Sequence, residues 1–273
     1  VKIIGAGLAG AEAAWQLAKK NIPVKLYEMR PEKMTDAHQS GYFSELVCSN
    51  SLRSNQLDNA AGLLKEELRQ LQSLLISVAD EVALPAGGAL AVDRETFSKK
   101  VTELLLKEPL IEIRHEEVTK IDPSDLTIIA SGPLTSQNLF NEIKKLTGED
   151  TLYFYDAAAP IVTTESIDMD NAFWQSRYDK GSGYDYLNCP LSREEYENFY
   201  QELIHSKWVE TKDFEKEIFF EGCMPIETMA SRGKETLLYG PMKPVGLINP
   251  KDSKTPYAVV QLRRDNLSGS LMN

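Results

Sequence analysis

The sequence has 273 residues, with 42% hydrophobic and 26% charged side chains, which is ordinary for a globular protein of one large or two medium domains. No run approaches the roughly 18 to 20 apolar residues of a membrane span, and the first residues lack the features of a signal peptide. The net charge of −11 excludes a non-specific nucleic-acid coat, because attraction to phosphate grows with positive charge.

The first thirty residues carry the clearest pattern. The β-branched run "VKII" leads into Gly5-Ala-Gly7-Leu-Ala-Gly10, then into "AEAAWQLAKKN" with apolar residues at helical spacing, and then into "PVKLYE", which ends on Glu28. This order of strand, glycine turn, helix and strand is typical of a dinucleotide site. Gly5 permits the tight turn, Gly7 lets the backbone approach a pyrophosphate, and Gly10 lets helix and strand pack closely.

The choice between FAD and NAD depends on two further segments. "LTIIASGP" predicts a strand over Leu126–Ala130 followed by a small-residue turn, and Asp93 or Arg94 is expected to open a helix toward the cofactor. Both features favour FAD, and Glu28 is expected to bind ribose hydroxyls and repel a 2′-phosphate. The predicted cofactor-binding residues are Gly5, Gly7, Leu8, Ala9, Gly10, Glu28, Met29, Arg30, Ser131 and Gly132.

The remaining segments predict an α/β protein with a Rossmann-like FAD-binding domain over residues 1–156, including a possible small insertion near 95–122. Residues 157–273 are expected to form an inserted α/β substrate domain. A helix is expected from Asp58 onward, with Leu64, Leu68, Leu71, Leu75 and Val78 on one face, and another over Arg193–Ile204. "LIEIRHEEVTKID" fits a strand pair or a strand and loop. No closing return to the FAD domain follows, so we expect a piece of a longer protein.

The three cysteines are widely spaced and form no CxxC pair: Cys48, Cys189 and Cys223. This pattern argues against a disulfide framework and a zinc site, and it favours a reducing, cytoplasmic setting. Pro225 suits the first turn of a helix before Gly233, which would place Cys223 at the positive end of that helix. By itself, however, Cys223 also fits a buried structural residue. The three histidines are expected at the surface: His38, His115 and His205.

The segment from Thr228 to Arg264 has seven basic and two acidic residues, a local charge of +5 in an acidic chain. It fits either a solvated loop region or an anion-binding face.

Many stretches together resemble the folate- and FAD-dependent tRNA (uracil-5-)-methyltransferases, the TrmFO family. They include "ELVCSNSLRS", "PAGGALAVDR", "YFYDAAAPIV", "FEGCMPIE", "GPMKPVGL" and "PYAVVQLRRDN". The resemblance implies that NADPH or NADH reduces FAD. 5,10-Methylenetetrahydrofolate then passes its one-carbon unit through the reduced flavin to C5 of uridine 54 in the tRNA T-loop.

The resemblance also implies roles for two thiols. We expect Cys223 to add to C6 of uracil and Cys48 to move the C5 proton, with the reverse assignment left open, and we expect Cys189 to be structural. The predicted RNA-binding residues are Arg232, Lys234, Lys243, Arg263 and Arg264. No metal is expected. The alternatives are a wobble-uridine-modifying GidA/MnmG-type flavoprotein, a small-molecule FAD oxidoreductase and a non-catalytic RNA-binding or flavin-sensing module.

Overall fold

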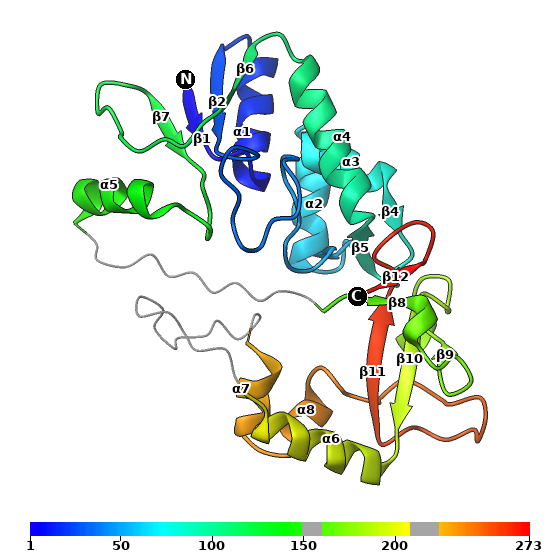
Figure 1. The fold of residues 1–273 in the computed structure, drawn as a ribbon. Helices are drawn as coiled ribbons and strands as arrows, with labels where there is room; N and C mark the ends of the chain where they lie inside the picture. The colour runs from blue at the N-terminus through cyan, green and yellow to red at the C-terminus, as the bar shows by residue number, and fades with distance from the viewer. Residues whose placement is uncertain (149–159, 208–223) are drawn as a thin grey trace. The chain divides into compact units, whose positions relative to one another are not determined.

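The computed structural model describes residues 1–148, 160–207 and 224–273, and divides the chain into two units (Figure 1). Unit 1 comprises Val1–Ala83 and Leu90–Ala158, and unit 2 comprises Leu84–Ala89 and Ala159–Asn273. The main division lies two residues from the expected boundary. The assignment of residues 84–89 to unit 2 was not expected from the sequence.

A four-stranded parallel sheet forms the centre of unit 1, in the order β6-β2-β1-β7. Its strands are β1 (Lys2–Ile4), β2 (Val24–Glu28), β6 (Ile111–His115) and β7 (Thr127–Ile129). Both faces of β1 are covered, since Ile3 belongs to one hydrophobic cluster and Ile4 to another. Burial on both faces explains why this strand has two consecutive apolar residues, Ile3 and Ile4, instead of an alternating pattern.

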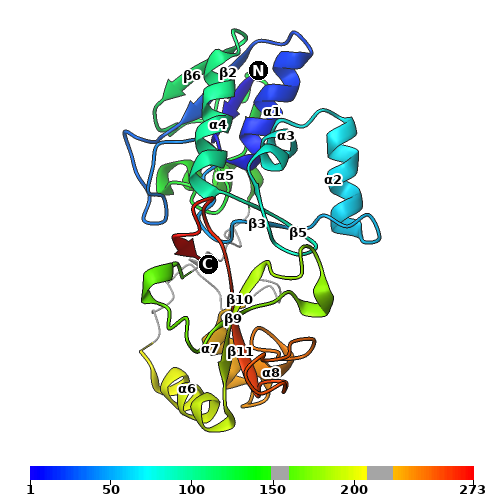
Figure 2. The same ribbon diagram turned by 90° about the vertical axis from the view of Figure 1, so that its right-hand side faces the viewer.

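Helices α1 (Leu8–Lys19), α3 (Leu74–Glu81) and α4 (Arg94–Lys107) pack against one another beside this sheet (Figures 1 and 2). The buried face of α1 consists of Gly10, Ala11, Ala14 and Ala18, whose small side chains allow a close approach. On the other side of β1, Leu139 of α5 (Gln137–Thr147) packs with Ile4 and Val118. Residues 95–122 hold most of α4 and all of β6, so they belong to the main sheet domain instead of forming an insertion.

The long helix expected from Asp58 is wrong, because the structure has two helices there: α2 (Ala60–Gln70) and α3. The chain turns at Gln72, which has a φ of +57°, and the Ser73 hydroxyl then caps α3 by accepting from the amide of Ile76. Glu12 of α1 adds to this cap by accepting from Ser73 Oγ at 2.8 Å and Leu75 N at 3.0 Å. A tertiary contact therefore ends the apolar stripe, and Leu64 and Leu71 are exposed.

A second sheet has the order β3-β5-β4, with strands β3 (Ser51–Ser54), β4 (Ala83–Leu84) and β5 (Ala89–Val92). Its β5 leads into Asp93, whose carboxylate caps α4 by accepting from the amide of Thr96 at 2.8 Å. The prediction that Asp93 and Arg94 open a helix is thus confirmed. The segment "LIEIRHEEVTKID" forms strand β6 and then a loop, so the alternative of a strand pair is wrong.

Unit 2 contains an antiparallel sheet of β9 (Phe173–Trp174), β10 (Tyr186–Leu191) and β11 (Ala258–Arg263), and a short pair of β8 (Val162–Thr163) and β12 (Leu271–Met272). Helix α6 (Arg193–His205) confirms the predicted helix and begins with a capping box of Ser192 and Glu195. The short helices α7 (Ile226–Ser231) and α8 (Thr236–Tyr239) pack beside it, and its Tyr196 lies in the unit's core.

Candidate functional site

Three glycines of the turn after β1 have different surroundings. Gly5 has a φ of +99°, and a Cβ there would lie 2.6 Å from the carbonyl oxygen of Ala130. At Gly10 a Cβ would lie 1.8 Å from the carbonyl oxygen of Gly5. A Cβ on Gly7 would meet no atom within 4 Å. Two glycines are therefore required by packing, whereas the third leaves open space beside the backbone.

The open space lies at the N-terminus of α1. Gly7 is the N-cap of this helix and contributes no side-chain hydrogen bond, and the amide of Ala11 makes the first intrahelical bond to the Gly7 carbonyl. The first-turn amides of a helix lack intrahelical acceptors, and the helix dipole adds positive potential at this end. The turn thus has the features of a phosphate site.

A pocket of about 310 Å³ opens onto this turn within unit 1. Nine of the ten predicted cofactor residues line it, and Gly10 instead lies behind the turn, in contact with Gly5. The pocket joins the carboxyl ends of β1, β2 and β7, where open parallel sheets bind their ligands. The lining residues that the sequence analysis singled out are Gly5, Gly7, Leu8, Ala9, Glu28, Met29, Arg30, Ser131 and Gly132.

Glu28 occupies the end of β2 and is buried at 7% relative exposure. One carboxylate oxygen accepts from the amide of Ala6 at 3.0 Å, and the other accepts from the amide and Nε of Arg30 at 3.1 and 2.9 Å. Burial alone raises the pKa of this carboxyl, but the hydrogen bond and charge of Arg30 and the two amides outweigh it, so the net pKa lies below its ordinary value. Glu28 is therefore an anion that holds the glycine turn against β2.

Arg30 lines the pocket, yet its guanidinium is committed to protein acceptors. Besides Glu28, it donates to the carbonyl of Ser40 at 3.2 Å and to the carboxylate of Glu45 at 3.2 Å. Glu45 in turn accepts from the amide and hydroxyl of Ser40. Arg30 thus joins the end of β2 to the loop of residues 40–45, and it acts on the pocket chiefly through that loop.

Several lining residues come from loops without a recognisable motif, and the sequence analysis missed them. Glu45, Val47, Thr35 and His38 all belong to the segment between β2 and β3, and Thr35 and His38 are joined by a 2.7 Å hydrogen bond. His38, which was expected at the surface, is half-buried and lines the pocket. At the opposite wall, the hydroxyls of Ser131 and Thr135 bond each other at 2.7 Å.

Cys48 is exposed and follows Val47, a residue of the pocket lining. Arg94 holds the loop in place, because its Nη1 donates to the carbonyls of Leu46 and, at 2.9 Å, of Cys48. Asn50, fully buried, fixes the other side by donating to the Val92 carbonyl at 3.0 Å. Neither Asp93 nor Arg94 lines the pocket, so the expected approach of this helix start to the cofactor is replaced by a clamp on the cysteine loop.

Cys223 lies outside the described residues, so its expected position at a helix N-terminus is not tested. Helix α7 begins at Ile226 and has six residues, and Pro225 is its N-cap instead of its first residue. Cys189 lies in β10 opposite Val260, and burial raises the pKa of its thiol. A raised pKa keeps that thiol protonated, which is unfavourable for a nucleophile.

The predicted RNA-binding residues lie on separate elements of unit 2. Arg232 ends α7, and Lys234 pairs with Glu197 of α6 at 2.6 Å. Arg263 donates to Asn273 at 2.9 Å, and the guanidinium of Arg264 lies 5.3 Å from the ring centroid of Trp174. Lys243 follows α8.

Within residues 1–148, 160–207 and 224–273, no group of three or more His, Cys, Asp or Glu side chains could hold a metal ion. No helix in the same ranges is long and apolar enough to cross a membrane.

The parallel sheet, the glycine turn and the pocket at its carboxyl edge define an α/β protein of the dinucleotide-binding class. Its fold is similar to that of GidA from Aquifex aeolicus, with a TM-score of 0.64 at 12% identity over 99% of this chain and 48% of that one. The chain also matches the family described as glucose inhibited division protein A over residues 1–273, and it belongs to that family.

Relatives in this family are far more similar in sequence. Proteins from Desulfitobacterium hafniense, Desulforamulus reducens and Bacillus licheniformis are 61%, 63% and 62% identical to it over all 273 residues. Each is named "Methylenetetrahydrofolate--tRNA-(uracil-5-)-methyltransferase TrmFO", which confirms the resemblance seen in the sequence. The chain spans 62% of the length of these relatives.

Proposed function

We propose that this chain is part of a tRNA (uracil-5-)-methyltransferase that takes its one-carbon unit from methylenetetrahydrofolate and uses FAD. The identity of 61–63% across all 273 residues to relatives named for this activity carries the proposal. It extends to the uridine at position 54 of the T-loop as target, to NADPH or NADH as reductant, and to a cytoplasmic setting. These finer points rest on the resemblance and on the cysteine usage alone.

The residues of the unit 1 pocket fit FAD. The open side of Gly7 and the first-turn amides of α1 would take the pyrophosphate, and Glu28 would accept from ribose hydroxyls while keeping its bonds to Ala6 and Arg30. As a buried anion, Glu28 would repel a 2′-phosphate at the same place. When bound and reduced by NADPH or NADH, the flavin would supply the two electrons that a folate methylene needs to become a methyl group.

The proposed chemistry on uracil needs a thiol, because C5 is a poor nucleophile until another group has added to C6. A thiolate suits this step since it attacks well near neutral pH and can leave again. We assign the attack to Cys223 and the removal of the C5 proton to Cys48, as the sequence suggests. The clamp of Arg94 and Asn50 supports a role for Cys48, since it fixes an exposed thiol next to the pocket lining.

The five predicted basic residues of unit 2 would bind RNA phosphates and set the register of the RNA. Lys234 is the weakest candidate among them, because its ammonium already pairs with Glu197. Arg264 is the strongest candidate for binding RNA together with an aromatic ring, because its guanidinium lies over the ring of Trp174.

The discriminating experiment uses the full-length protein with a T-arm RNA that carries 5-fluorouridine at position 54. With the folate donor and the reductant present, we expect a covalent protein–RNA adduct in wild type, because after one-carbon transfer to C5 the fluorine cannot leave as a proton does and the thiol stays bound to C6. The adduct should be lost in Cys223→Ala, and transfer of label from the folate one-carbon unit to unmodified uridine should require Cys48 as well. Absence of both adduct and label transfer would refute the proposal.

The wobble-uridine-modifying paralogue remains the second candidate, because the fold is similar to Aquifex aeolicus GidA. Label transfer to a complete unmodified tRNA distinguishes the two, since the paralogue would place the label in the anticodon and not in the T-loop.

A further inference from the structure

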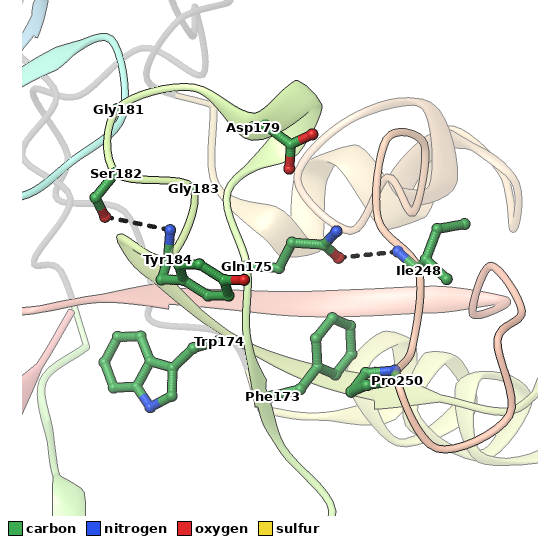
Figure 3. A pocket seen from close by; sticks show the side chains of 10 residues that line it. All are labelled: Phe173, Trp174, Gln175, Asp179, Gly181, Ser182, Gly183, Tyr184, Ile248 and Pro250. Atoms are coloured by element: carbon green, nitrogen blue, oxygen red, sulfur yellow. Dashed lines mark hydrogen bonds between the residues drawn. The ribbon is translucent and has the colours of Figure 1, made fainter.

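Unit 2 has a pocket of its own, of about 440 Å³, which none of the predicted site residues lines (Figure 3). Its walls are β9, the turn that follows β9, and the loop around Ile248. The lining residues include Trp174, Gln175, Asp179, Ser182, Tyr184 and Ile248.

Aromatic rings form one side of this pocket. Trp174 and Tyr184 both line the pocket, and Tyr184 is 69% exposed (Figure 3). The guanidinium of Arg264 lies 5.3 Å from the Trp174 ring, which adds a positive charge beside the aromatic surface. Exposed rings with a nearby arginine are the surface on which unstacked RNA bases stack.

Polar groups of both kinds also line the pocket. The Gln175 Oε1 accepts from the amide of Ile248 at 2.9 Å, which fixes the orientation of the side chain and directs its NH₂ group to the side of Asp179 (Figure 3). The Asp179 carboxylate lies at the rim. The pocket therefore offers an amide donor and a carboxylate acceptor, which complement the acceptor and N–H groups along the edge of a nucleobase.

The turn that carries these groups is fixed before any ligand arrives. Asp185 is buried at 4% exposure and accepts from the amides of Gly87 and Ser182 at 2.7 and 3.3 Å. Its own amide bonds the Ser176 hydroxyl at 3.0 Å. The sharp path places Tyr178 and Asp179 at φ values of +56° and +53°, a costly conformation that these contacts maintain. Such pre-organisation reduces the entropy lost on binding.

We propose that this pocket binds one unstacked nucleobase of the RNA substrate, with its face on Trp174 and Tyr184 and its edge on Asp179 and Gln175. The inference rests on the proposed function for its ligand, but it assigns a site that the basic residues and the cysteines do not include. The alternative is that Asp179 is a solvated surface acid, in which case its charge repels RNA.

The two alternatives predict opposite changes in the Kd for tRNA when Asp179 is replaced by asparagine. Asparagine tolerates the left-handed backbone of this position, so the turn should keep its shape. If the carboxylate accepts from a base, its loss should weaken binding of an unmodified tRNA transcript to the full-length protein by about tenfold. If it only repels phosphates, binding should become slightly tighter. Asp170→Asn, at an exposed acid of the same unit outside the pocket, is the matched control and should leave the Kd unchanged.

A second pair of variants tests the stacking surface. Tyr184→Ala should weaken binding by about fivefold or more, and Tyr184→Phe should restore it, because stacking needs the ring and not the hydroxyl. The slope of log Kd against log salt should stay as in wild type, since no phosphate contact is lost. Failure of the wild type to bind tRNA would overturn the proposed function. Tight wild-type binding with unchanged or tighter binding by Asp179→Asn would overturn the pocket assignment alone.

Discussion

Replacing Gly10 and Gly7 by alanine, one at a time, separates the two uses of glycine in the turn. In Gly10→Ala the new methyl group would lie 1.8 Å from the Gly5 carbonyl oxygen, so α1 and the turn must move apart by more than about 1 Å. The contact is between backbone and Cβ, and no flexible side chain can yield. We therefore expect a loss near the upper end of overpacking costs, about 3 kcal/mol.

In Gly7→Ala the new methyl group meets no protein atom, and the φ of −70° is accessible to alanine. Alanine is a poorer N-cap than glycine, which lowers the free energy of unfolding, and it makes the unfolded chain stiffer, which raises it. Each effect is below about 1 kcal/mol, and the two oppose each other. The fold should therefore be nearly as stable as wild type. The methyl group, however, occupies the space proposed for the pyrophosphate, so affinity for FAD should fall at least tenfold.

Thermal unfolding of the full-length apoprotein and flavin-fluorescence titration measure the two effects. Gly10→Ala should lower the Tm by about 6–12 °C, and Gly7→Ala by less than about 4 °C. A Gly10→Ala protein as stable as wild type would show that the close approach to Gly5 is wrong. A Gly7→Ala protein with wild-type FAD affinity would show that the phosphates lie elsewhere.

Three further predictions concern single side chains. Glu28→Gln leaves Arg30 buried with only Glu45 as its anionic partner, so urea unfolding should show a loss of about 3 kcal/mol. The pKa of Glu28 in the folded protein lies below its ordinary value of 4.5, so the stability that the Glu28 carboxylate contributes is complete above pH 4.5 and is lost as the pH falls further. Unfolding measured from pH 6 to 3 should show this loss in wild type and much less of it in Glu28→Gln. Arg94→Met should release the Cys48 loop and change the rate of Cys48 alkylation at fixed pH more than Arg94→Lys does, whereas Cys189 should react slowly in all variants because burial raises its pKa.

The glycine turn, its flanking strands and the helices α1, α4 and α6 could be predicted because their signals are local. Glycine spacing, apolar periodicity and capping residues such as Asp93 and Ser192 lie within a few residues of the structure that they determine. The same locality explains why nine predicted cofactor residues line one pocket, since a βαβ unit brings its own turn and strand ends together.

Features that depend on contacts distant in sequence could not be predicted. The break between α2 and α3 needs Glu12, more than sixty residues earlier, to cap the second helix. Residues 84–89 join unit 2 because the Ala86 carbonyl accepts from the Tyr186 hydroxyl at 2.8 Å and the Gly87 amide donates to Asp185. No sequence periodicity predicts the contacts at either place. The first set determines where α3 begins, and the second determines that residues 84–89 belong to unit 2.

One network of hydrogen bonds and ion pairs links the pocket of unit 1 to the loop that carries Cys48. It runs from the Ala6 amide through the carboxylate of Glu28 to the guanidinium of Arg30, and from there to Glu45, three residues before Cys48. Arg94 fixes the far side of the same loop. A change at Glu28 should therefore affect both flavin affinity and the alkylation rate of Cys48, although Glu28 is 20 residues from that thiol in sequence. If Glu28→Gln altered flavin affinity while Cys48 reacted as in wild type, this network would not couple the pocket to the loop that carries Cys48.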